Sequence, residues 1–281
     1  MGVHVSIGGG LTGALKEAVN TGCESFQIFA GNPRGWARKP LDPKDIERFK
    51  TEYAQTTLGP MAVHLAYLPN LASSDSELYE KSVLCLGEDY LRANQLGADF
   101  FVVHPGKGNK DQTLSTSIKR AADAIRTVLD KVNGPTCFLL ENQAGAGHEI
   151  AGKMEDLWEI IQLVDCPERM GVCFDTCHAF AAGYELRTAE GWVKLNREIE
   201  AGLGMKMLRL LHLNDARGDL GSHLDRHEHW GEGFLGAEAF RNLIKEPHWR
   251  ELPGILETPV EKPGDEQRDL SFLRALITEP R

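Results

Sequence analysis

The chain has 281 residues, of which 42% are hydrophobic and 26% charged, and its formal net charge is −10 at pH 7. These proportions are ordinary for a globular protein with a sizeable core, and no apolar run reaches the roughly 18 residues that a membrane-spanning helix requires. The negative charge argues against a broad basic surface for nucleic acid, although bound cations are absent from that sum. Any such affinity would therefore be confined to one groove.

The cysteines are scattered through the chain without the paired spacing of a zinc ribbon. They are Cys23, Cys85, Cys137, Cys166, Cys173 and Cys177. We expect small buried side chains in a reducing, cytoplasmic compartment, and thiolates are not the first choice of metal ligand.

Strand-like and helix-like segments alternate along the whole chain. In order, we expect a strand at Gly2–Ser6, a helix at Leu11–Thr21, a strand at Ser25–Ala30, a helix from Pro43 to Tyr53, a strand at Met61–Ala66, a helix from Ser73–Asp75 to about Gln95, a strand at Phe100–His104, a helix at Leu114–Leu129, a strand at Cys137–Glu141, a helix at Leu157–Val164, a strand at Met170–Asp175, a helix at Thr188–Gly202, a strand at Leu208–Leu213, a helix at Ala237–Lys245, a strand at Gly254–Glu257 and a helix at Gln267–Ile277. The strands are mostly continuous apolar runs, as in parallel strands that are buried on both faces. The helices show apolar residues at a period of 3.6.

Eight strand–helix units without a break in composition predict an α/β fold, a single (β/α)8 TIM barrel over residues 1–281. An open doubly wound sheet is the alternative, but no Gly-x-Gly-x-x-Gly turn follows the first strand. The polar segment Asn214–Gly236 is long for a loop, so we expect it to be functional or held by a metal.

Imidazole and carboxylate side chains stand at or just beyond the ends of six consecutive predicted strands and in the long loop. They are His64, His104, Glu141, Asp175, His178, His212, Asp225, His227 and Glu257. In a barrel the carboxyl ends of the strands surround one mouth, which is where such proteins place their active sites. We therefore expect these side chains to meet there.

Any one of these residues alone would more often be structural, but the set is harder to explain in that way. Few cationic side chains stand near the strand ends, and burying several carboxylates without counter-charge is very costly. Mixed histidine and carboxylate ligands favour Zn²⁺, with Mn²⁺ or Fe²⁺ as possible substitutes, and nine ligands suffice for three ions. Because residues three apart in an extended chain point to opposite sides, Asp175 and His178 should reach different ions unless the chain turns at Thr176.

The remaining histidines fit the cluster less well. His4 lies at the mouth end of the first strand and could assist a substrate, and His229 continues the alternation of Asp225 and His227 as a fallback ligand. We expect His148 and the remaining two to be surface or loop residues. These two are His223 and His248.

The segment GVCFDTCHAFAAGY at 171–184 forms one long motif, and a second runs from HLND at 212–215 through GS at 221–222 to DRHE at 225–228. These two motifs resemble signatures of the endonuclease IV family of apurinic/apyrimidinic endonucleases. Shorter similarities are VVHPG at 102–106, LEN at 140–142 and LET at 256–258. The pair His229-Trp230 departs from the pattern, in which we expect less bulky residues.

The resemblance implies a monomeric barrel with three zinc ions that cleaves double-stranded DNA at abasic sites. It groups the ligands as His64, His104 and Glu141 at one zinc, Glu141 with Asp175, His212 and Glu257 at the second, and His178, Asp225 and His227 at the third. The hydrolysed bond would be the phosphodiester 5′ to the abasic sugar, which leaves a 3′-hydroxyl and a 5′-deoxyribose phosphate, and 3′-blocking groups would also be removed. Glu141 would be catalytic, orienting the attacking water or accepting its proton.

The resemblance also implies which residues enter the DNA. Arg34 would enter the base stack, and Tyr67 and Leu68 would act as a wedge, although ordinary packing of a loop over the barrel would explain the last two equally well. Lys107 and Lys110 are candidate phosphate contacts.

Two other functions remain open from the residues alone. A metal-dependent sugar isomerase or epimerase on the same barrel would need one or two metals, so His178, Asp225 and His227 would be surplus. A metal-stabilised module that only binds damaged DNA would need every metal to be closed to further ligands, which mixed histidine and carboxylate ligation disfavours.

Overall fold

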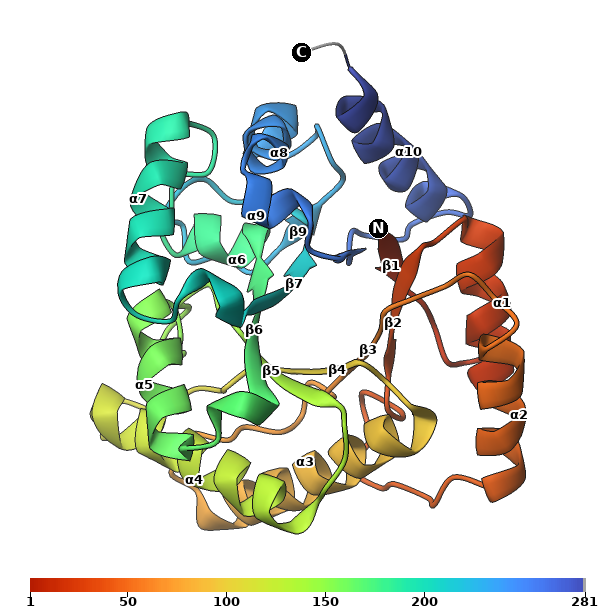
Figure 1. Ribbon diagram of the computed structural model, residues 1–281. Helices are drawn as coiled ribbons and strands as arrows, with labels where there is room; N and C mark the ends of the chain where they lie inside the picture. Colours follow the sequence, from red (N-terminus) through yellow and green to blue (C-terminus); the bar gives the residue numbers. More distant parts are fainter. Residues whose placement is uncertain (280–281) are drawn as a thin grey trace.

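The computed structural model describes residues 1–279, and within this range eight parallel strands close into a barrel (Figure 1). The barrel strands are β1 (Gly2–His4), β2 (Ser25–Phe29), β3 (Met61–His64), β4 (Phe100–Val103), β5 (Cys137–Glu141), β6 (Met170–Asp175), β7 (Leu208–His212) and β10 (Gly254–Leu256). Neighbours in the barrel follow chain order, and β1 pairs with both β2 and β10. The prediction of a TIM barrel is confirmed.

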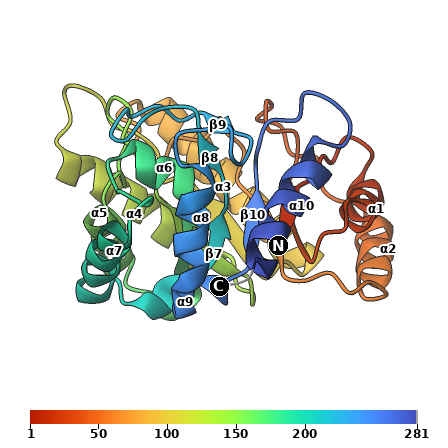
Figure 2. The same cartoon turned by 90° about the horizontal axis from the view of Figure 1, so that it is seen from above.

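Helices surround the barrel (Figures 1 and 2). They are α1 (Leu11–Thr21), α2 (Pro43–Tyr53), α3 (Ser76–Leu96), α4 (Leu114–Lys131), α5 (Met154–Val164), α6 (Thr176–Ala181), α7 (Ala189–Ala201), α8 (Gly236–Lys245), α9 (Pro247–Arg250) and α10 (Asp265–Thr278), with short 3₁₀ turns η1 (Pro167–Arg169) and η2 (Met205–Met207). The caps explain several starting points: Asp42 and Asp75 each accept a hydrogen bond from a backbone N–H in the first turn of α2 and α3. None of the described helices is both long and apolar enough to cross a membrane.

The structure corrects the predicted elements in three places. Helices α6 and α9 were not expected, and the predicted long loop contains the two-stranded antiparallel sheet of β8 (Asp215–Ala216) and β9 (His227–Glu228). Figure 2 shows α6, β8 and β9 gathered at one end of the barrel, the end at which the strands finish. The segments that hold the predicted ligands His178 and His227 are therefore partly helix and strand rather than loop.

The inside of the barrel is closed by a layer of small and apolar side chains, which we call the barrel plug. It consists of Ala62, Val102, Leu139, Cys173, Leu210 and Ile255, all at most 1% exposed. Side chains along a strand alternate between its two faces, so the residue two positions after each plug residue also faces the interior, one layer nearer the mouth. Those residues are His64, His104, Glu141, Asp175, His212 and Glu257.

Candidate metal centre

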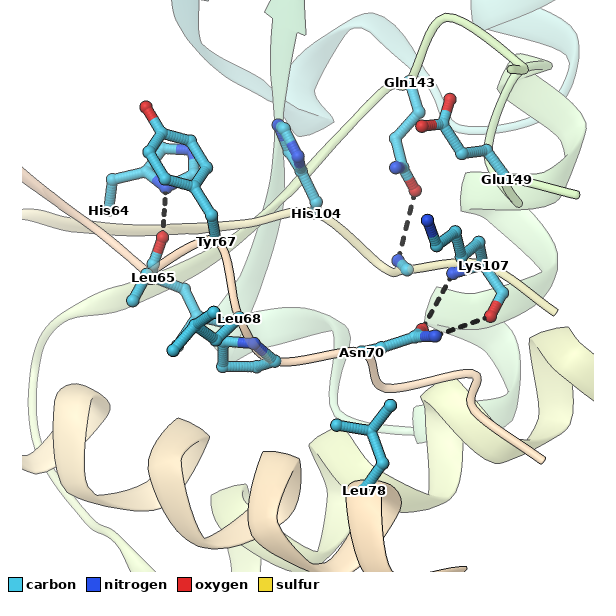
Figure 3. A pocket seen from close by; sticks show the side chains of 13 residues that line it. His64, Leu65, Tyr67, Leu68, Asn70, Leu78, His104, Lys107, Gln143 and Glu149 are labelled. Atoms are coloured by element: carbon cyan, nitrogen blue, oxygen red, sulfur yellow. Dashed lines mark hydrogen bonds between the residues drawn. The ribbon is translucent and has the colours of Figure 1, made fainter. Parts of the chain in front are cut away.

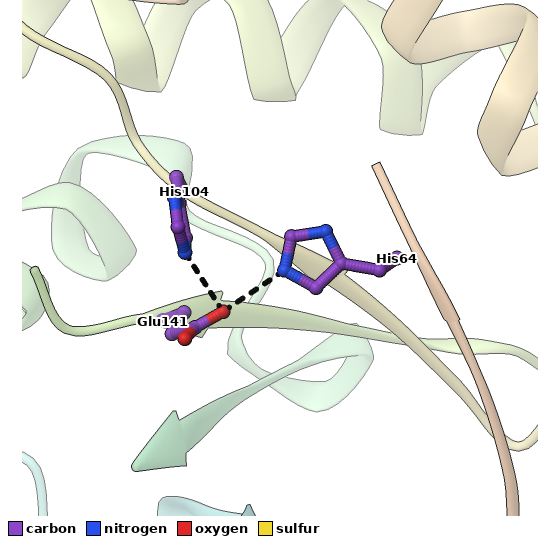
Figure 4. A group of neighbouring side chains, drawn as sticks. All are labelled: His64, His104 and Glu141. Atoms are coloured by element: carbon purple, nitrogen blue, oxygen red, sulfur yellow. Dashed lines mark hydrogen bonds and ion pairs between the residues drawn. The ribbon is translucent and has the colours of Figure 1, made fainter. Parts of the chain in front are cut away.

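Glu141 lies at the centre of the interior layer and is fully buried. One carboxylate oxygen, Oε2, lies 3.1 Å from Nε2 of both His64 and His104 (Figure 4). The other, Oε1, lies 2.9 Å from Nδ1 of His212 and 3.3 Å from Nδ1 of His178. Burial acts to raise the pKa of Glu141, but the surrounding histidines, His212 first, outweigh it and hold the pKa well below its ordinary value.

Three of the histidines donate a hydrogen bond from one ring N–H to a backbone carbonyl. Nδ1 of His64 contacts the oxygen of Leu65 at 2.6 Å, and Nδ1 of His178 contacts that of Asn142 at 2.9 Å. Nδ1 of His227 contacts the oxygen of Glu257 at 2.9 Å. A carbonyl can only accept, so Nδ1 carries a proton in each of these histidines. When the ring is neutral, Nε2 therefore holds the lone pair, which is the form that binds a metal.

A second cluster, closer to solvent, joins His178, Asp225 and His227. Nε2 of His178 lies 3.2 Å from Oδ1 of Asp225, whose side chain is 48% exposed. Burial acts to raise the pKa of Asp225, but His178 outweighs it and the pKa falls to about 2. Nε2 of His227 lies 3.7 Å from the nearer oxygen of Asp175, and it is buried with no hydrogen-bond partner in the described part of the chain.

The nine predicted residues form three groups in which one ligand atom from each residue lies within 4.8 Å of the others. The groups are His64, His104 and Glu141; Glu141, Asp175, His212 and Glu257; and His178, Asp225 and His227. Every donor is an imidazole nitrogen or a carboxylate oxygen, and the lone pair of His227 Nε2 is otherwise unused. The residues therefore fit metal ions, and clusters of this kind are typical of metalloenzymes.

Two cysteines also lie near these groups. Cys173 falls within 4.8 Å of Glu141 and His212, and Cys177 lies near Asp175 and His227. Burial raises the pKa of the Cys173 thiol to about 12 and that of Cys177 further. Because the thiolate is the ligand form, burial disfavours both sulfurs as ligands relative to the nearby nitrogens and oxygens.

The expected reason for the separation of Asp175 and His178 is wrong. The chain is not extended there, because α6 begins at Thr176 and Asp175 caps it by accepting the backbone N–H of His178 at 2.7 Å. The two side chains nevertheless fall into different groups, since His178 projects from the helix toward Asp225.

The long loop is held by the buried carboxylate of Asp215. Asp215 accepts backbone N–H groups of the glycine-rich turn that ends the loop, including Gly231 at 3.0 Å, Gly233 at 3.2 Å and Leu235 at 2.9 Å. With the pairing of β8 and β9, these bonds fix the segment that carries His227.

The fallback ligand His229 does not reach the site. Its Nδ1 lies 2.7 Å from the carboxylate of Asp269 on α10, and the neighbouring Trp230 donates its indole N–H to the oxygen of Leu213. The His229-Trp230 pair is therefore part of the packed interior. His223 is exposed as expected, with one ring nitrogen 2.9 Å from the oxygen of Ala144.

Sequence reasoning missed three polar residues that support the centre. Gln27, in β2, contacts His212 and Glu257. Asn142 and Asn214 each follow a barrel strand and bond to Asp175. The asparagines could have been found as polar residues just beyond a strand end, whereas Gln27 lies within a mostly apolar strand.

Two cavities open beside the centre and share Tyr67. One, of about 440 Å³, lies over the exposed cluster. The other, of about 320 Å³, lies between Tyr67 and Leu68 on one side and Lys107 on the other, with His104 between them (Figure 3).

The predicted DNA-contacting residues lie on loops at the ends of β2 and β3. Tyr67 is 69% exposed and packs edge-on against Phe29, with ring centroids 5.1 Å apart. Leu68 is half-buried, and Arg34 is exposed on the loop after β2. That loop is anchored by a buried ion pair between Arg38 and Asp89. Lys110 is exposed.

Comparison with known proteins shows the family to which this barrel belongs. Residues 15–276 match the family described as the xylose isomerase-like TIM barrel, and the chain belongs to that family. Within it, the chain is 42% identical over 277 residues to a protein of Methanoculleus marisnigri named probable endonuclease 4, and the match covers 98% of each chain. It is also similar to the crystal structure of endonuclease IV from Thermus thermophilus, at 34% identity and a TM-score of 0.85, covering 99% of this chain and 98% of that one. The chain is a member of the endonuclease IV family.

The fold is shared more widely. A D-tagatose 3-epimerase-like protein superposes with a TM-score of 0.73 over 99% of this chain and 97% of its own, but at only 19% identity. This likeness shows a common fold alone.

Proposed function

We propose that this chain is a zinc-dependent endonuclease that hydrolyses double-stranded DNA at the phosphodiester 5′ to an abasic site. The observation that carries the proposal is the convergence of the predicted side chains on one barrel mouth, in three groups of metal-ligand chemistry. Membership of the endonuclease IV family supports a DNA-cleaving hydrolase, and the groups match those that the sequence motifs imply.

The three groups would hold three Zn²⁺ ions, with Glu141 shared between two of them. Mn²⁺ or Fe²⁺ could substitute, because all donors are nitrogen or oxygen. Bound zinc would supply Lewis acidity at a phosphate oxygen and at the departing 3′-oxygen.

The chain's own residues would position the reactants. Glu141, buried and ionised, would orient the attacking water or accept its proton, so that the new bond to phosphorus forms as the bond to the 3′-oxygen breaks. The 3′-oxygen leaves as a hydroxyl and the abasic sugar keeps the phosphate at its 5′ position. The same hydrolysis would remove groups that block a 3′-end.

The rim of the cavities would receive the bent DNA. Tyr67 and Leu68 stand beside His64 and His104 on the wall of the smaller cavity, where a wedge would hold the gap left by the displaced lesion (Figure 3). Arg34 would enter the stack from the neighbouring loop, and Lys107 would contact a phosphate on the opposite wall. These contacts are local, which is compatible with a net charge of −10.

The alternatives account for fewer residues. A sugar epimerase would use the buried carboxylates and histidines but would leave the His178, Asp225 and His227 group without a role. A module that only binds damaged DNA would need closed metal sites, whereas His104 and Asp225 have side chains 29% and 48% exposed. We also propose that the protein acts as a monomer. Its free cysteines support a reducing compartment such as the cytoplasm.

The test uses a duplex with one abasic analogue. Zinc-loaded protein should incise it 5′ to the lesion, chelator-stripped protein should not, and added zinc should restore incision. An otherwise identical undamaged duplex is the control. Failure to incise in every sample would refute the endonuclease, and epimerisation of a ketose by the loaded protein would favour the alternative.

A further inference from the structure

Gln27 is fully buried inside the barrel, and its amide contacts two residues of the interior layer and His4 of β1. The amide nitrogen lies 2.7 Å from Oε1 of Glu257 and 3.0 Å from Nδ1 of His4. The amide oxygen lies 2.9 Å from Nε2 of His212.

The orientation of this amide is determined by its neighbours. A carboxylate can only accept, so the group that faces Glu257 must be the N–H₂. The opposite orientation would place two acceptor oxygens 2.7 Å apart. The amide oxygen therefore faces His212, and Nε2 of His212 must carry a proton to be bonded.

The hydrogen bond from Nε2 of His212 to the amide oxygen of Gln27 fixes the tautomer of His212. With the proton on Nε2, the lone pair stays on Nδ1, which lies 2.9 Å from Oε1 of Glu141 and 3.2 Å from Oε2 of Glu257. These carboxylates are members of the same candidate metal group. Gln27 thus binds a histidine and a carboxylate of one group at the same time.

His212 is oriented in a different way from three of the other histidines. His64, His178 and His227 are oriented by backbone carbonyls, which no substitution can remove. The contact on Nε2 of His212 is made by a side chain, so its effect can be tested.

We propose that Gln27 is a positioning residue that sets the tautomer and ring orientation of His212, and thereby the zinc affinity of the group formed by Glu141, Asp175, His212 and Glu257. The inference rests on the proposed zinc centre. Residues that orient a metal ligand in this way change metal affinity by about 10- to 100-fold when they are replaced.

The experiment compares Gln27→Met, which keeps the volume and removes both bonds, with Gln27→Glu, which keeps only an acceptor for His212. Zinc is titrated against a chromophoric chelator, and long-range ¹H–¹⁵N spectra of the zinc-loaded proteins report the imidazole tautomers. His212 is assigned by the loss of its signals in His212→Asn. We expect Gln27→Met to bind one zinc about 10- to 100-fold more weakly and to lose the Nε2-protonated signature of His212. Gln27→Glu should retain that signature.

Gln143→Met is the matched control, because Gln143 is also buried, at 6% exposed, and accepts the N–H of Gly106 instead. It should bind zinc as the wild type does. Wild-type affinity and an unchanged His212 signature in Gln27→Met would overturn the inference and leave the proposed function standing, as would an equal loss of zinc in Gln143→Met. A wild-type protein that binds no zinc would instead contradict the proposed centre itself.

Discussion

The two parts of the centre are built in different ways. The floor group, His64, His104, Glu141, Asp175, His212 and Glu257, stands on or directly after barrel strands and is mostly buried. The rim group, His178, Asp225 and His227, comes from α6, from the segment before β9 and from β9 itself, and half of the Asp225 side chain is exposed.

The difference shows what each part requires in order to form. The floor follows from strand periodicity once the barrel closes, because each of its residues lies two positions after a plug residue. The rim depends on a folded loop whose position is set by Asp215 and by the β8–β9 pair. Substitutions that disorder the rim group should therefore leave the floor group folded.

The largest effect should come from replacing Glu141, the floor residue that belongs to two metal-ligand groups. Glu141→Gln keeps the shape but removes the charge that faces four histidines, so we expect incision of an abasic duplex to fall by about 10³-fold or more. Single-turnover rates measure this. Glu47→Gln, exposed on the outer helix α2, is the control and should stay within about twofold, since such surface changes are usually small. Undiminished incision by Glu141→Gln would exclude the assigned role.

A smaller effect is expected at the rim. Asp225→Asn should weaken the binding of one of the three proposed zinc ions and lower incision by roughly 100-fold, because one carboxylate ligand is lost. Since Asp225 is half exposed, excess zinc should restore part of the activity. Metal content after dialysis and incision with added zinc measure the two effects. Loss of all zinc from this variant would contradict the independence of floor and rim.

The support of the rim can be tested without touching a ligand. Asp215→Asn replaces a carboxylate oxygen with an N–H₂ that faces backbone N–H donors, so the free energy of unfolding should fall by about 2–3 kcal/mol. Urea denaturation measures the loss, and zinc should leave the rim before the floor. Asp219→Asn, on the exposed part of the same loop, should change stability by less than about 0.5 kcal/mol.

The smallest effect concerns pH in the chelator-stripped protein. Burial acts to lower the pKa of His178, but Asp175 and Asp225 outweigh it and raise the pKa well above its ordinary value. The protonated histidine therefore stabilises the fold fully below about pH 6.5, and this contribution is lost as pH rises through the folded-state pKa. Urea denaturation should therefore show a larger free energy of unfolding at pH 6 than at pH 9.

Zinc should reverse this dependence, because it binds only the deprotonated imidazole. The stabilisation by zinc should therefore increase with pH over the same range. In His178→Asn the pH dependence of the stripped protein should become flatter, and an unchanged profile would show that His178 is not its source.

The sequence predicted the barrel because its strands are apolar runs and its helices have periodic apolar faces. It could not predict α6, since all six residues from Thr176 to Ala181 are buried and leave no amphipathic pattern. The two-residue strands β8 and β9 are too short for any pattern.

The same limit applies to the centre. The floor ligands stand at recognisable strand ends, so they could be grouped before the structure was known. Gln27 could not, because its contacts with His212 and Glu257 join residues about 185 and 230 positions apart and exist only when the barrel is closed. The role of Asp215 is likewise visible only in the folded loop.

The spacing between plug and floor has a consequence for how this protein can change. Inserting or deleting one residue between Leu139 and Glu141 would turn the carboxylate to the outside of the barrel, because strand faces alternate. The strands that carry the floor group can therefore keep their geometry when a residue is substituted, but not when a residue is inserted or deleted. The loops beyond it have no such constraint, so new specificities on this scaffold should arise by lengthening or exchanging loops over an inherited floor.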